Sequence, residues 1–199
     1  AKRLLAATNA QFMDDVTFAV AIHVDVDAKV GQVVCPIAPT HSNSMGFKVR
    51  FYGLASHAAS QQKGKDAVLM AVEAITAMEF MAAKEIKVTD ARLLNIGSIH
   101  GGSTNNVICD HVSIFGSCRA WEDAVSEYME QRIQEICEGI ATMNGGRAEY
   151  KQGKFLPYRI NHPVMAERVR ETAKKVGGEE NIITPNRNLG GEDFGFISR

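Results

Sequence analysis

Alternating apolar and polar residues mark one strand of this chain most clearly. Phe47, Val49 and Phe51 alternate with charged or polar residues in the stretch FKVRFY. This period of two is typical of an antiparallel strand with one buried face. We therefore expect a strand over residues 47–52, followed by a turn of small residues.

Further periodic patterns after that turn predict two helices and three more strands. Asp66 can cap a helix whose apolar residues recur at helical spacing, namely Val68, Ala71, Val72, Ile75 and Met78. The elements expected after it are strands at 91–99 and 107–120, a helix at 122–143 and a strand at 146–155. The resulting β-α-β-β-α-β order predicts a ferredoxin-like sandwich of two helices on one sheet.

The segments on either side of this unit predict parts of a second, α/β domain. Residues 16–26, VTFAVAIHVDV, are almost continuously apolar and β-branched, which indicates a strand buried on both faces. Pro163 can begin a helix, and the glycine-rich turn NLGGEDF follows later in the chain. The expected domains are one part of the α/β domain at 1–44, the inserted ferredoxin-like domain at 45–155, and the other α/β part at 156–199.

The balance of charge argues against a nucleic-acid or membrane-surface partner. The 199 residues carry 22 Lys and Arg against 23 Asp and Glu, so no basic excess is available for phosphate groups. No apolar run reaches the ~20 residues that cross a bilayer. The four cysteines have no paired short spacing, which indicates reduced thiols and a cytoplasmic location rather than a disulfide framework.

Two histidines stand where a ligand-binding side chain is expected. His57 lies in the small-residue turn after the 47–52 strand, where Gly53 allows a backbone conformation that other residues resist. His23 lies near the carboxyl end of the 16–26 strand, where open α/β sheets place ligand sites and neutral imidazole often binds metal. Each has a structural alternative, since His57 can cap or pack the turn and His23 can be a core residue.

Polar side chains at the ends of other predicted strands suit a carboxylate. Arg119 offers a fork of hydrogen-bond donors. Asn105 or Asn106 can both donate and accept hydrogen bonds. Together with His57, these residues predict a pocket for a carboxylate and an adjacent amide carbonyl.

Five ordered motifs, AIHV, LASHAA, IHGGSTNNVI, SCRAW and LGGEDF, carry a resemblance to a known family. They resemble the amidohydrolase family of metallopeptidases that includes hippurate hydrolase, indole-acetyl-amino-acid hydrolases, aminoacylase and carboxypeptidase G. The hippurate and auxin-conjugate hydrolase branch is the most similar. The resemblance implies a zinc-peptidase-like α/β catalytic domain with an inserted ferredoxin-like lid. In that family the lid often pairs two subunits, so a homodimer is expected.

The resemblance also implies an activity and roles for individual residues. The implied reaction is hydrolysis of the amide bond of an N-acyl amino acid or small peptide-like substrate, assisted by two divalent ions such as zinc or manganese. The implied roles are His23 as a metal ligand, His57 as a catalytic residue that stabilises the oxyanion, Asn106 and Arg119 as ligands of the substrate carboxylate, and Gly190 and Gly191 as a backbone wall. Glu192 is given only a supporting role.

Other residues that the family uses are expected outside this sequence. Its Cys-Gly-His segment and Glu-Glu pair would precede Ala1, and its last histidine ligand would follow Arg199. One imidazole cannot hold two metal ions, because each ion needs about three to four protein ligands. We therefore expect the chain to be an internal fragment that is inactive alone. The alternative is a metal-free dimerisation or small-carboxylate-binding module.

Overall fold

The computed structural model describes residues 16–36, 41–183 and 189–197, and the structural statements below refer to these residues. The chain divides into two compact units. The inserted unit comprises Ser44–Phe155, and the flanking unit comprises Ala1–Asn43 with Leu156–Arg199.

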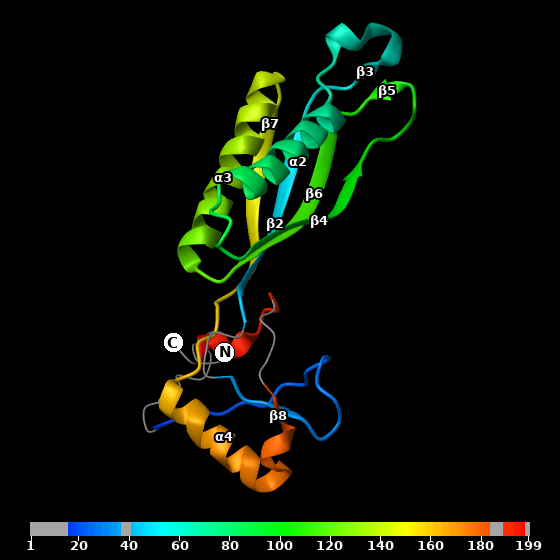
Figure 1. Ribbon diagram of the computed structural model, residues 1–199. Coiled ribbons are helices and arrows are strands. Elements are labelled where there is room, and N and C mark those ends of the chain that lie inside the picture. The colour runs from blue at the N-terminus through cyan, green and yellow to red at the C-terminus, as the bar shows by residue number, and fades with distance from the viewer. Residues whose placement is uncertain (1–15, 37–40, 184–188, 198–199) are drawn as a thin grey trace. The chain divides into compact units, whose positions relative to one another are not determined.

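The inserted unit contains a four-stranded sheet with two helices on one of its faces (Figure 1). Its strands are β2 (Asn43–Tyr52), β4 (Arg92–Gly101), β6 (His111–Ala120) and β7 (Arg147–Leu156), in the spatial order β4-β6-β2-β7. Its helices are α2 (Ala67–Lys84) and α3 (Asp123–Met143). The order β2-α2-β4-β6-α3-β7 confirms the predicted ferredoxin-like sandwich.

The core of the inserted unit lies between the sheet and the two helices. Buried and partly exposed residues alternate along all ten residues of β2, which confirms the alternation predicted for residues 47–52 and extends it to Asn43. Val49 and Phe51 have no exposed surface, and Met129 and Ile133 of α3 are equally buried. Asp66 caps α2 as predicted, because its side chain accepts hydrogen bonds from the first backbone N–H groups of the helix.

The predicted apolar stripe of α2 is only partly right. Ala71 and Met78 are buried, but Val68 and Val72 are 43% and 52% exposed. The buried face is completed by Ala67, Met70, Ala74, Met81 and Ala82. Because α2 also exposes apolar residues, helical periodicity alone could not identify the face that packs on the sheet.

Gly53 is required by a close approach of two backbone segments. A Cβ atom at this position would lie 2.0 Å from the carbonyl oxygen of Lys65. Gly53 is not among the glycines with positive φ, so the predicted special backbone conformation is wrong. The glycine instead leaves room for Lys65 beside the turn that carries His57.

The flanking unit contains one longer helix and a pair of very short parallel strands. The helix is α4 (Pro163–Gly177), which begins at Pro163 as predicted. The strands β1 (Val33–Val34) and β8 (Ile182–Ile183) pair in parallel, and η3 (Glu179–Asn181) and η4 (Asp193–Phe196) are short 3-10 helices. None of the described helices is long and apolar enough to cross a membrane.

The predicted buried strand at 16–26 is wrong for the described structure. The segment forms no strand, and Ile22 and Val26 are 99% and 96% exposed. No described strand pairs with it, so its backbone has no ladder of hydrogen bonds to join. His23 therefore lies on exposed chain rather than at the end of a buried strand.

Candidate functional site

The loop that carries His57 is attached to the loop that carries Asn106. Strand β3 (Ser56–His57) pairs with β5 (Val107–Ile108) in antiparallel register. The Ala58 N–H also donates a hydrogen bond of 2.9 Å to the carbonyl oxygen of Asn106. Both His57 and Asn106 are exposed, so these two predicted site residues are adjacent and accessible.

The backbone around His57 determines which nitrogen of its ring carries the proton. His57 caps the short 3-10 helix η2 (Ala58–Lys63), and its Nδ1 accepts a hydrogen bond of 3.1 Å from the Ala59 N–H. Because Nδ1 accepts, the neutral ring must carry its proton on Nε2. The capping alternative is therefore correct, and it leaves Nε2–H as a hydrogen-bond donor.

The amide of Asn106 is held by a neighbouring hydroxyl. The Thr104 hydroxyl donates to the side-chain oxygen of Asn106 at 3.2 Å and to that of Asn105 at 3.4 Å. The amide oxygen keeps a second lone pair, so the oxygen and the NH₂ group of Asn106 can both serve a ligand. An amide NH₂ suits a carboxylate oxygen.

Arg119 lies at the opposite end of the sheet from this pair. Within the β4–β6 ladder, Arg119 pairs with Leu93 at one end and Val112 pairs with Gly101 at the other. The strand rise places Arg119 about 24 Å from Val112. The prediction that His57, Asn106 and Arg119 form one pocket is therefore wrong within a single chain.

His23 in the flanking unit has the opposite tautomer to His57. Its Nδ1 lies 2.6 Å from the carbonyl oxygen of Val24. A carbonyl only accepts, so Nδ1 must donate, and the neutral ring keeps a lone pair on Nε2. Metal-binding histidines commonly have this arrangement, with one nitrogen bonded to a carbonyl and the other on the metal.

A group of polar residues near His23 was not found from the sequence. The ring centroids of His23 and His41 are 6.1 Å apart. Burial, together with the nearby Arg159 and His23, lowers the pKa of His41 to about 4, so this ring is neutral at neutral pH. The backbone N–H of Arg159 donates a hydrogen bond of 3.1 Å to the backbone carbonyl of His41. The guanidinium of Arg159 forms a largely buried ion pair of 3.4 Å with the Glu192 carboxylate.

The segment with Gly190 and Gly191 is attached to the same part of the flanking unit. The Ser42 hydroxyl donates a hydrogen bond of 2.9 Å to the carbonyl oxygen of Leu189. The carbonyl oxygen of Gly190 lies 3.4 Å from the same hydroxyl. His41 and Ser42 stand next to each other in the chain, so this segment and Arg159 approach the same short stretch. The only sequence signal for His41 and Arg159 was polar character at the predicted domain boundaries.

The described residues do not make a complete metal site. Among them, no three His, Cys, Asp or Glu side chains are grouped so that they could hold a metal ion. The free Nε2 of His23 fits one ligand position, but a single imidazole is not sufficient for the expected pair of ions.

Comparison with known proteins shows what this chain is similar to. Residues 40–142, just over half of the chain, match the M20 peptidase dimerisation domain. The N-acetyldiaminopimelate deacetylase of Streptococcus sanguinis is 30% identical over 178 residues, which are 88% of this chain and 47% of the relative. The chain thus spans about half the length of the curated relatives it matches.

Two solved structures show the same fold. The aminobenzoyl-glutamate utilization protein of Klebsiella pneumoniae is 26% identical with a TM-score of 0.78, over 94% of this chain and 47% of that protein. The YXEP protein of Bacillus subtilis, described as a dinuclear metal-binding peptidase of the M20 family, is 21% identical with a TM-score of 0.66. That match covers 88% of this chain and 43% of the YXEP chain.

Proposed function

The chain belongs to the M20 peptidase dimerisation domain family, and we propose that it acts within a metal-dependent enzyme that hydrolyses the amide bond of N-acyl amino acids. The inserted unit, Ser44–Phe155, would be the lid and dimerisation domain. The flanking unit would be part of the catalytic domain. The deacetylase and peptidase names of the similar proteins support this class of reaction.

The observation that carries the proposal is the pair of opposite tautomers. His23 presents the lone pair that a metal ligand needs, because its Nδ1 is bonded to a carbonyl. His57 presents the N–H that an oxyanion needs, because its Nδ1 is bonded to a backbone N–H. The backbone thus prepares each ring for the role that the proposal gives it.

The remaining roles follow from the chemistry of each group. Two bound divalent ions would supply a Lewis acid and an activated water. The Nε2–H of His57 would donate to the oxyanion as the carbonyl is attacked. Arg119 of one chain and the partner subunit's Asn106 would bind the substrate carboxylate through guanidinium and NH₂ donors. Gly190 and Gly191 would form a wall of backbone that admits the substrate closely.

The match to a dimerisation domain favours a site built from two chains. Within the inserted unit, His57 and Asn106 lie together, whereas Arg119 lies at the other end of the sheet. In a two-fold dimer, each chain gives the same residues to the other. Each active site would then combine His23 of one chain with the partner subunit's His57.

The exposed face of α2 is the surface that we propose for this dimer. Val68, Leu69 and Val72 are 43%, 49% and 52% exposed, and Phe80 further along the helix is 60% exposed. Such residues recur at helical spacing and form an apolar stripe, as in interaction surfaces. The neighbouring strand β4 is an edge of the sheet, so its backbone could pair with a second copy.

Replacing Val72 with glutamate is expected to convert the dimer into a monomer. The substitution would bury a carboxylate in the proposed interface, which is strongly unfavourable without a partner charge. Light scattering coupled to size-exclusion chromatography measures the mass directly. Val176→Glu is the matched control, because Val176 is 86% exposed on α4 outside this surface. An unchanged dimer for Val72→Glu, or dissociation by both variants, would reject the α2 surface.

Metal content and hydrolysis together test the proposed reaction. The protein that carries this chain with flanking segments like those of its relatives should bind about two divalent ions per chain. It should also release amino acid from N-acyl amino acids, and stop doing so when a chelator removes the ions. A dimer without metal or hydrolysis would instead favour the metal-free dimerisation or carboxylate-binding module.

A further inference from the structure

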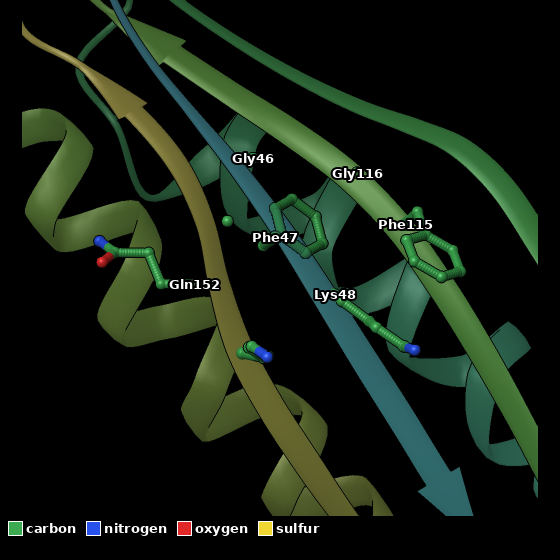
Figure 2. A pocket seen from close by; sticks show the side chains of 8 residues that line it. Gly46, Phe47, Lys48, Phe115, Gly116 and Gln152 are labelled. Carbon is green, nitrogen blue, oxygen red and sulfur yellow. The ribbon is translucent and has the colours of Figure 1, made fainter. Parts of the chain in front are cut away.

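One face of the four-stranded sheet is not covered by helices, and it is rich in positive charge. Figure 2 shows α2 and α3 behind the strands, with Lys48 and Phe115 beside each other. On this face the Arg147 guanidinium lies 3.7 Å from the ring centroid of Tyr52. The carboxylate of Glu149 already accepts a hydrogen bond of 2.8 Å from the Tyr52 hydroxyl. Positive groups therefore outnumber carboxylates along β2 and β7.

Three glycines from neighbouring strands make a hollow in this face. Gly46 of β2, Gly116 of β6 and Gly153 of β7 line a shallow hollow that is open to solvent (Figure 2). A Cβ atom at Gly116 would lie 2.3 Å from the ring of Phe47, so that ring lies directly against the glycine. The exposed ring of Phe115 stands beside the glycine backbone of this hollow.

Two lysines stand at this hollow without a protein carboxylate to pair with them. The Nζ of Lys48 lies 4.9 Å from the ring centroid of Phe115, and Lys151 lines the same hollow from β7. Among the described residues, neither lysine forms an ion pair. The site therefore combines an apolar lining with two positive charges.

We propose that this hollow binds a small apolar carboxylate, such as an aromatic acid. The flat apolar part would lie against the glycine backbone and the ring of Phe115, which is 39% exposed, and the carboxylate would lie between Lys48 and Lys151. The site shares no residue with the proposed catalytic groups, so it stands or fails independently of them.

Three probes separate the contribution of the charge from that of the ring. We expect benzoate to shift the backbone amide signals of Gly46, Gly116 and Gly153 in ¹H–¹⁵N NMR spectra of the full chain. Acetate has the charge without the ring and benzyl alcohol has the ring without the charge. Each should bind at least about tenfold more weakly than benzoate. Equal binding of acetate or of benzyl alcohol would overturn the proposal.

Variants of the two lysines provide the second part of the test. The double variant Lys48→Gln with Lys151→Gln should bind benzoate at least about tenfold more weakly. Lys87→Gln is the matched control, because Lys87 is exposed in the same unit but does not line the hollow. Wild-type affinity in the double variant would overturn the proposal. The proposal would also be overturned if the amide signals of the three glycines shifted when protein concentration alone was raised. Such shifts would show that a second copy of the chain covers this face.

Discussion

Replacing Gly53 with alanine is expected to lower the free energy of unfolding of the inserted unit by about 3 kcal/mol, at the upper end of the cost of overpacking. The new methyl group would lie 2.0 Å from the Lys65 carbonyl oxygen and 2.9 Å from its carbon. Both are backbone atoms, so no side chain can rotate away. Leu54 and Lys65 also exchange two backbone hydrogen bonds of 2.9 Å, which the methyl group would push apart. Denaturation in urea measures the change.

Gly139→Ala is the matched control for Gly53→Ala. Gly139 lies inside α3, and an added Cβ atom would meet nothing within 4 Å. Alanine is the better helix former by about 1 kcal/mol, so this variant should be more stable than the wild type. The same chemical change is thus expected to have opposite signs at the two positions. Wild-type stability of Gly53→Ala would show that Lys65 moves away at little cost, contrary to the prediction.

The elements that were predicted correctly are those whose signals are local. The alternation of β2 and the cap at Asp66 depend on residues within a few positions of each other, and both are found in the structure. The segment at 16–26 failed because its apolar residues indicate burial without indicating what buries them, and Ile22 is exposed in the described structure. The prediction of the buried face of α2 was partly wrong for a related reason, since helical periodicity cannot distinguish a core face from an interaction face.

The sequence named candidate site residues, but it could not show how they are arranged. His57 and Asn106 are brought together by strands of two residues each, which are too short to give a periodic signal. Arg119 is on the same inserted unit, yet the length of β6 places it at the other end. The contacts among His41, Arg159 and Glu192 join residues that are far apart in the sequence, so no local pattern predicts them.

Replacing His57 with alanine is expected to lower kcat of the proposed enzyme by about 10²–10³-fold, the usual effect of removing one oxyanion donor. The free energy of unfolding should fall by only about 1 kcal/mol, the usual contribution of a helix cap such as the lost hydrogen bond to Ala59. KM for an N-acyl amino acid should change little, since the oxyanion exists only after attack on the carbonyl. His111→Ala is the control, because His111 is exposed in the same unit and its ring pairs with Asp110. Equal loss in both variants would argue against a catalytic role for His57.

Mixing two inactive variants tests whether His57 acts in the site of the other chain. His57→Ala chains keep His23, and His23→Ala chains keep His57. If each site combines His23 of one chain with the partner subunit's His57, a mixed dimer has one intact site. Random pairing makes half of the dimers mixed, so the mixture should recover about a quarter of wild-type activity. If both histidines act within one chain, every site lacks one of them and no activity returns. Recovery therefore requires exchange of His57 between the chains, whereas its absence from a well-mixed sample would place the whole site in a single chain.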